Sequence, residues 1–63
     1  MKDLTHNQWN AALSRNGIRP VGFLGYYDIG NGVSVSVLNA GQFATRRAKL
    51  AWLLRRQAEE VTA

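Results

Sequence analysis

The stretch Thr45–Val61, TRRAKLAWLLRRQAEEV, decides the fold because it is the longest segment with one clear hydrophobic period. At the helical period of about 100° per residue, its aliphatic residues gather on one side. That side consists of Leu50, Ala51, Leu54, Ala58 and Val61. The pattern predicts a C-terminal helix over residues 45–61 that turns this stripe toward the core.

A cluster on nearly the opposite side of the same helix is not explained by folding alone. Lys49, Trp52 and Arg56 are separated by steps of three and four residues, which makes them neighbours on a helix surface. A tryptophan between two cations, facing away from the apolar stripe, indicates a recognition surface. We therefore expect the indole of Trp52 to look outward.

Length and composition favour a single small domain over residues 1–63. A chain this short buries only a small core, so dimerisation is a further expectation. The chain has no cysteine, which excludes disulfides, thiol nucleophiles and cysteine-based metal sites. No apolar run has the character of a signal peptide or the length of a membrane span. We expect a soluble, cytoplasmic protein whose net charge of +4 favours anionic partners.

The N-terminal segment carries signals for the start of a helix. Thr5 is a suitable N-cap, and Gln8 completes a T-x-x-Q capping box. The face predicted to be buried consists of Trp9, Ala12 and Leu13. These signals predict a helix over residues 6–16.

The same segment also carries signals for the end of that helix. Gly17 suits the left-handed position that follows many helices, and Ile18 would then contact Leu13. Pro20 prevents the helix from continuing. We therefore expect a compact helix that ends before the strands begin.

From Val21 the hydrophobic period changes to two, which indicates strands. One face of the first predicted strand consists of Val21, Phe23, Gly25, Tyr27 and Ile29. After the turn Gly30-Asn31-Gly32, one face of the second strand consists of Val33, Val35 and Val37. The two runs predict an antiparallel hairpin.

The turn sequence Gly30-Asn31-Gly32 allows two registers. A two-residue loop would place Val35 opposite Asp28, whereas a three-residue loop with Gly32 at a bulge would place Val35 opposite Tyr27. We prefer the second, because register follows the hydrophobic pattern. The pairs it predicts are Ile29 with Val33 and Tyr27 with Val35.

These elements predict an α+β fold in the order α-β-β-α, with a two-stranded antiparallel hairpin covered by two helices. Because an isolated hairpin is barely stable in water, both helices should cover its apolar face. Pairing of hairpins across a homodimer would complete a four-stranded sheet. In the connector, Phe43 should join the core, and either Asn39 or Thr45 caps the last helix.

The residues of enzyme sites are sparse in this chain. His6 lies in the first turn of the first helix with no positioned partner, as a general base would need. The four carboxylates are scattered or adjacent at a helix end, so they form no acid–base pair and no metal cluster. We expect no catalytic residue, no metal and no cofactor, and we interpret the chain as a non-enzymatic binding protein.

The basic tract supports two hypotheses about the partner. In the first, a protein or nucleoprotein is bound through Trp52 as an anchor, with cations around it as in interface hot spots. In the second, the same helix binds nucleic acid through phosphate contacts. The predicted binding residues are Arg46, Lys49, Trp52, Arg55 and Arg56. In a structural alternative, the arginines line a solvated helix face and Trp52 is covered by the first helix or a second subunit.

The overall length and the ending TRRAKLAWLLRRQAEE, after a short glycine-turned hairpin, resemble the small accessory proteins of bacteriophages and prophages, some of which inhibit host defence systems. No binding or catalytic motif matches residue by residue, so the resemblance assigns no functional residue. It implies a protein that acts by stoichiometric contact with a macromolecular partner.

Overall fold

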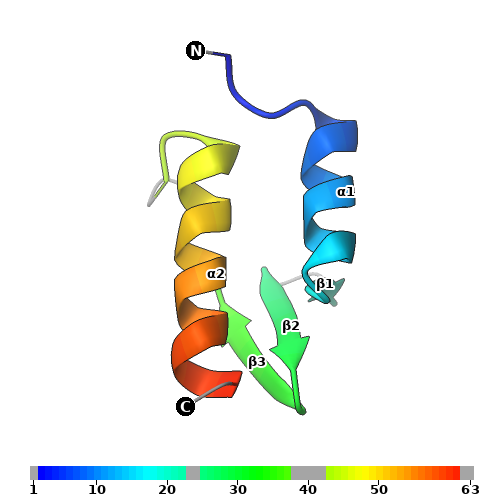
Figure 1. Ribbon diagram of the computed structural model, residues 1–63, viewed down its shortest axis with the longest axis vertical. Helices are drawn as coiled ribbons and strands as arrows, with labels where there is room; N and C mark the ends of the chain where they lie inside the picture. Colours follow the sequence, from blue (N-terminus) through cyan, green and yellow to red (C-terminus); the bar gives the residue numbers. More distant parts are fainter. Residues whose placement is uncertain (1, 23–24, 38–42, 62–63) are drawn as a thin grey trace.

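The computed structural model describes residues 2–22, 25–37 and 43–61, and these residues form an α+β fold. Its elements in chain order are α1 (His6–Arg15), β1 (Arg19–Val21), β2 (Tyr26–Gly30), β3 (Val33–Ser36) and α2 (Arg46–Val61). Figure 1 shows the two helices side by side and running in the same direction. Within the described ranges, neither helix is long and apolar enough to cross a membrane.

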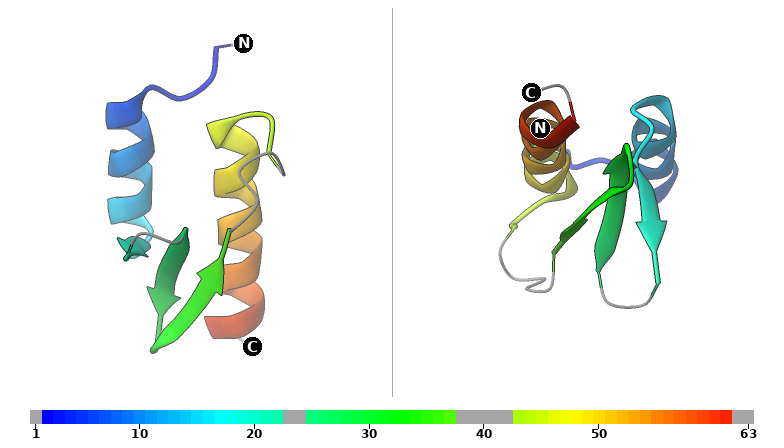
Figure 2. Two further views of the ribbon diagram at one scale, coloured as in Figure 1. Left: turned by 180° about the vertical axis from the view of Figure 1, so that it is seen from behind. Right: turned by 90° about the horizontal axis from the view of Figure 1, so that it is seen from below.

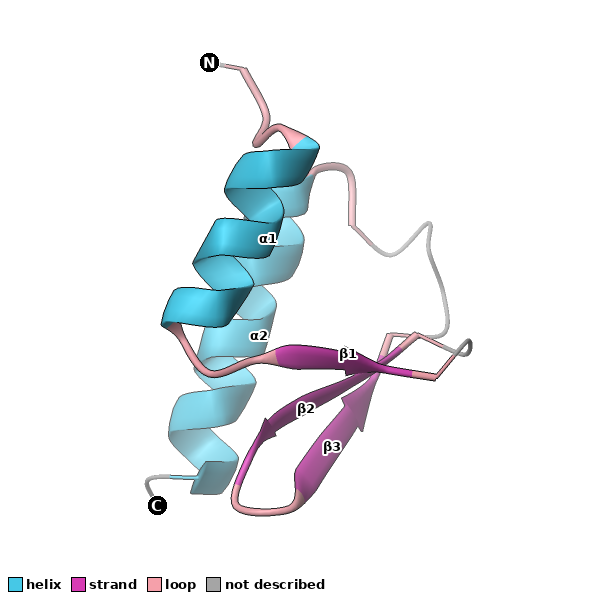
Figure 3. Ribbon diagram, turned by 90° about the vertical axis from the view of Figure 1, so that its right-hand side faces the viewer, coloured by secondary structure: helices cyan, strands magenta, loops and turns pink. Residues whose placement is uncertain are grey.

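The helices lie on one side of the sheet, and the core lies between these two layers (Figure 3). The sheet is antiparallel with strand order β1-β2-β3. The view from below in Figure 2 also shows both helices on the same side of the strands. The buried core consists of Trp9, Ala12, Leu13, Ile18, Tyr27, Ile29, Val35, Val37 and Leu53. The prediction that both helices cover the apolar face of the β2–β3 hairpin is confirmed.

Helix α1 has the start that was predicted. The hydroxyl of Thr5 accepts from the Gln8 backbone N–H at 3.1 Å, and the Gln8 side chain accepts from the Thr5 N–H at 2.9 Å. This reciprocal pair is a complete capping box. The buried residues of the helix are Trp9, Ala12 and Leu13, as predicted.

The end of α1 also agrees with its local signals. The N–H of Ile18 donates to the Leu13 carbonyl at 2.9 Å, and the N–H of Gly17 donates to the Ser14 carbonyl at 3.2 Å. These two bonds define a Schellman motif. Ile18 and Leu13 are both buried in the core cluster, and β1 begins at the next residue, Arg19. The motif therefore leads the chain from α1 directly into the sheet.

The prediction of a two-stranded hairpin is wrong, because the described residues contain a third strand. Residues 21–29 were predicted to be one strand, but the chain reverses within them, and Val21 pairs with Tyr26 across β1 and β2. Gly22 and Gly25 both have positive φ, at 71° and 72°, so they act as turn residues rather than as bends within a strand. Val21 is exposed in consequence, and Phe23 lies outside the described residues.

The β2–β3 turn combines the two alternatives that the sequence allowed. Asn31 and Gly32 both have positive φ, at 54° and 75°, and Gly30 pairs with Val33, so the loop has two residues. The predicted pairing of Ile29 with Val33 is therefore wrong. A register shift between Asp28 and Gly30 restores the predicted pairing of Tyr27 with Val35. This β-bulge keeps Ile29 and Val35 in the core.

Helix α2 begins at Arg46 and is capped by Thr45, one of the two residues predicted for this role. The Thr45 hydroxyl accepts from the Ala48 N–H at 3.1 Å. The other candidate, Asn39, lies outside the described residues. A second cap comes from far away in the sequence, because the Asp3 carboxylate accepts from the backbone N–H groups of Arg46 and Arg47 at 3.0 and 3.1 Å.

The rotation of α2 about its axis differs from the prediction. Leu53 is fully buried, at 0% exposure, whereas the predicted core residues Leu50 and Leu54 are only partly buried. Ala51 and Ala58 of the predicted stripe are exposed, and the Val61 side chain is outside the description. The helix therefore turns Leu53 to the sheet, with Leu50 and Leu54 to one side of it.

Candidate interaction surface on helix α2

The side chain of Trp52 was predicted to point away from the core, but it does not. Its ring lies 5.6 Å from the ring of Phe43 with planes inclined by 55°, and it packs against the core cluster while remaining partly exposed. The correction follows from the rotation of α2, because burying Leu53 brings the preceding residue toward the sheet layer. Phe43 packs against the core but stays partly exposed, so the prediction that it joins the core is confirmed only in part, and its role as the ring partner of Trp52 was not foreseen. No local signal in the connector could have indicated that role.

Lys49 was also predicted to lie on the outer face, and this prediction is wrong. Its Nζ lies 5.3 Å from the ring centroid of Trp9 and 5.0 Å from that of Tyr27, and the side chain is partly buried. The two rings meet edge to face at 6.4 Å. Cation–π attraction explains why an ammonium group occupies an inward position. Lys49 therefore joins α2 to α1 and the sheet.

Arg56 is committed to the acidic end of its own helix. Its guanidinium lies 3.1 Å from the Glu60 carboxylate and 3.6 Å from the Glu59 carboxylate, and its side chain is 36% exposed. The Arg56–Glu60 pair has the i, i+4 spacing of neighbours on a helix, and Glu59 approaches the same guanidinium at i, i+3. Such partly exposed pairs contribute little to stability, but they lower the net positive charge beside Trp52.

The cations at the start of α2 contact the N-terminal segment. Arg46 donates from Nη1 to the Leu4 carbonyl at 2.9 Å, and Arg47 donates from Nε to the Lys2 carbonyl at 3.1 Å. The hydrogen bond from the backbone N–H of Arg46, above all, holds the pKa of the Asp3 carboxyl below its ordinary value of 3.8. Desolvation opposes this shift, and the backbone N–H groups of Leu4 and Arg47 and the charge of Arg46 lower the pKa further. Residues 2–4 thus hydrogen-bond to the start of α2 and lead directly into the start of α1.

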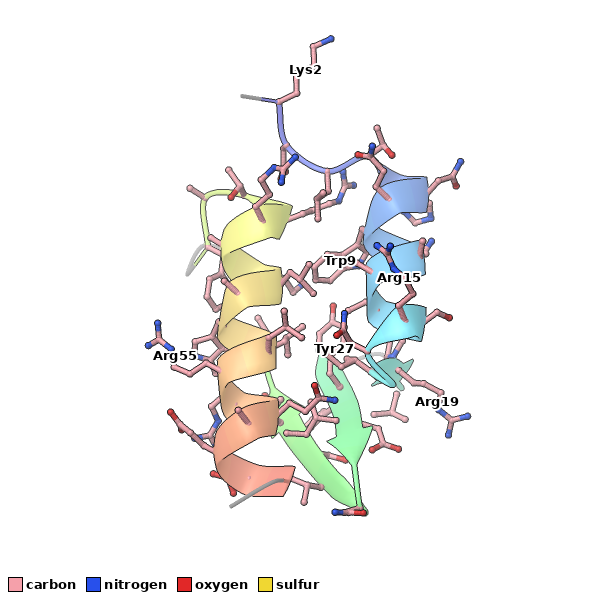
Figure 4. The ribbon with its side chains drawn as sticks, in the orientation of Figure 1. Lys2, Trp9, Arg15, Arg19, Tyr27 and Arg55 are labelled. Carbon is pink, nitrogen blue, oxygen red and sulfur yellow. The ribbon has the colours of Figure 1, made fainter. Side chains whose placement is uncertain are left out.

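Four cations make no side-chain hydrogen bond, ion pair or cation–π contact within the described residues. They are Lys2, Arg15, Arg19 and Arg55. Figure 4 shows them on different parts of the molecule: Lys2 beyond the helix N-termini, Arg15 and Arg19 on the α1–β1 side, and Arg55 projecting from α2. The positive charge is therefore spread over the surface and does not form a stripe along α2.

The structure thus keeps part of the predicted site together. We call Phe43, Trp52, Arg55 and Arg56 the Trp52 flank. Arg55 is exposed and lies one helical turn from Trp52, as does the half-exposed Arg56. Lys49 and Arg46 are excluded from this surface, because their charged groups are held by the core rings and by the Leu4 carbonyl.

Other chemistry is limited within the residues that the structure describes. No group of three or more His, Asp or Glu side chains there could hold a metal ion. His6 is exposed, and its Nε2 lies 3.1 Å from the Asn10 side-chain amide on the same helix.

Comparisons with known proteins do not assign this chain to a family. No family model matches the chain, and neither a curated protein nor a solved structure is significantly similar to it. The resemblance to phage accessory proteins stays a prediction.

Proposed function

We propose that this protein is a non-enzymatic binding module that makes stoichiometric contact with a macromolecular partner, a protein or nucleoprotein, through the Trp52 flank. The observation that carries the proposal is the ring pair of Phe43 and Trp52, which is packed on the core yet partly open to solvent. Tryptophan and arginine are the residues most enriched among those that dominate binding energy.

The fixed position of Trp52 favours binding. Because its ring is held against Phe43 and the core, little side-chain entropy is lost when a partner covers the remaining surface. Arg55 has no ion-pair partner within the described part of the chain, so its guanidinium is available to a carboxylate or a backbone carbonyl. Arg56 would widen this contact at the cost of its pairs with Glu59 and Glu60.

Nucleic acid is the second candidate. It is favoured by the fact that the unpaired charged side chains in the described residues are all cations, on a chain of net charge +4. It is disfavoured by their placement, because a phosphate backbone is best met by cations gathered along one face. The carboxylates of Glu59 and Glu60 also lie beside Arg56.

Site-specific photocrosslinking tests the proposal. A photoreactive residue is placed at Arg55 and, as a matched control, at the exposed α1 position Asn7. We expect a discrete crosslinked protein from the Arg55 position in a lysate of the source cells, retained after nuclease treatment, and no such product from Asn7. Equal products from both positions, or none from Arg55, would contradict the proposal.

Two substitutions define the contribution of the ring. Trp52→Phe keeps an aromatic ring on Phe43, whereas Trp52→Ala removes it, and circular dichroism verifies the folded fraction of each variant. We expect crosslinking to fall modestly with phenylalanine and strongly with alanine at equal folded fraction. If the product instead disappears after nuclease treatment, nucleic acid is the partner.

A further inference from the structure

A groove lies between the two helices, apart from the Trp52 flank. Its volume is about 390 Å³, and it is lined by Leu4, Gln8, Ala11, Ala12, Arg15 and Leu50. The α1 residues among these recur at steps of three and four, so they form one face of that helix. The groove therefore runs along α1 for about 10 Å, the length of two helical turns at 1.5 Å per residue.

Apart from Gln8 and Arg15, the lining of this groove is apolar, and it has small residues at its centre. Ala12 is buried beneath it, Ala11 is exposed, and Leu4 and Leu50 are partly buried at its sides. Small side chains allow another helix to approach closely, and aliphatic side chains from that helix would fill the space. The shape suits an amphipathic helix with two or three aliphatic anchors.

The charge around the groove indicates which kind of helix fits. Its lining contains no acidic residue, and Arg15 at its end has no ion-pair partner within the described part of the chain. The carboxylates of the protein are engaged elsewhere, Asp3 at the start of α2, Asp28 on the Gly30 N–H and the two glutamates on Arg56. An incoming helix with acidic flanks would meet unpaired positive charge.

We propose that this groove binds an acidic amphipathic helix of another protein, with its aliphatic stripe on Ala11, Ala12 and Leu50 and a carboxylate on Arg15. A second copy of this chain fits less well. A two-fold pairing through the groove would bring two identical positive surfaces together, on molecules that each carry a charge of +4. The inference does not depend on the proposed function of the Trp52 flank.

Fluorescence anisotropy with a designed probe tests the groove. The probe is a labelled, alanine-based helical peptide with leucines at i, i+3 and i+7 and glutamates beside them. Two control peptides have the leucines redistributed around the helix or the glutamates replaced by lysines. We expect saturable binding of the probe, and affinity at least about tenfold lower for either control.

Variants of the protein test whether the probe binds in the groove. Ala11→Glu fills the groove, offsets the charge of Arg15 one helical turn away and is compatible with a helix, so we expect at least about a tenfold loss of affinity. Arg15→Gln should cost about threefold and weaken the salt dependence. Ala51→Glu places the same charge on an exposed α2 position outside the groove lining, and we expect little change.

Three results would overturn the inference. The first is no saturable binding of the probe. The second is equal binding of the redistributed peptide, or binding that Ala11→Glu leaves intact. The third is a concentration-dependent dimer, seen by analytical ultracentrifugation, that Ala11→Glu abolishes, since the groove would then hold a second copy. Arg55→Glu should leave probe binding unchanged, which separates a failure here from a failure of the Trp52 flank.

Discussion

The two helices of this protein lie side by side and yet are specified in different ways. Helix α1 has its start, its end and its buried face written in its own sequence, through the Thr5–Gln8 box and the Gly17–Ile18 turn. Helix α2 begins where its sequence indicates but is rotated away from the predicted face. The comparison shows that local signals position the ends of a helix more reliably than its rotation.

The inward ridge of α2 explains the difference. It consists of Lys49, Leu53 and Gln57, at steps of four residues, so two of its three members are polar. Lys49 lies over two aromatic rings, and the Gln57 amide donates to the carbonyls of Asn16 and Ile29 at 2.7 and 3.1 Å. A pattern that treats polar residues as surface residues therefore selects the wrong side.

The largest effect should come from Leu53→Ala, which tests the rotation of α2 directly. Removing a fully buried leucine costs about 2 to 5 kcal/mol, against a total stability of roughly 3 to 9 kcal/mol for a domain of this size. Urea unfolding followed by circular dichroism measures the loss. Leu54→Ala is the matched control and should cost less, because Leu54 is only partly buried. A larger loss for Leu54→Ala would restore the face predicted from sequence.

Gln57→Leu should have the next largest effect, because it keeps the bulk of the side chain and removes its two hydrogen bonds. The part-buried Ile29 carbonyl loses a donor, so we expect a destabilisation of about 1 to 2 kcal/mol. Thermal unfolding measures it, with Arg55→Leu as an exposed control on the same helix. Equal melting temperatures for Gln57→Leu and wild type would mean that these bonds do not orient α2.

Gly17→Ala tests whether the end of α1 depends on its own local sequence. Gly17 has φ of 67°, and apart from its chain neighbours no atom of the described residues lies within 4 Å of an added Cβ, so backbone strain is the expected cause of destabilisation. The cost should be about 1 kcal/mol. Chemical unfolding of Gly17→Ala and of the exposed control Ser14→Ala gives the difference. If both variants are equally stable, the end of α1 does not depend on its left-handed residue.

The smallest effect should be the pH dependence of the hydrogen bonds between the Asp3 carboxylate, which lies just before α1, and the first N–H groups of α2. Because the folded-state pKa of Asp3 is lowered below 3.8, its carboxylate stabilises the fold above that pH, and this contribution is lost as the pH falls through the folded pKa. Melting temperatures of wild type and Asp3→Asn should differ at neutral pH and converge below about pH 4. A difference that stays constant across this range would show that the charge of Asp3 is not involved.

The candidate site was only partly predictable for the same reason. Sequence placed Trp52, Arg55 and Arg56 among the predicted binding residues, and these three lie together on the Trp52 flank. It also included Lys49, because nothing near that residue in the chain reveals that Trp9 and Tyr27 will stand over its ammonium group. The extra strand was missed for another reason. Glycine occurs both at bends within a strand and in turns, and only the positive φ values of Gly22 and Gly25 show that they are turn residues here.

By itself the sequence determined the α+β class, both ends of α1 and the pairing of Tyr27 with Val35, and it narrowed the cap of α2 to two residues, Asn39 and Thr45. These features depend on hydrogen bonds within a few residues or on a simple alternation of side chains. Only the tertiary structure decided the strand reversal before β2, the rotation of α2 and the partial covering of Trp52. Those depend on contacts between residues far apart in the chain, where a ring or a carbonyl can hold a polar side chain in an inward position.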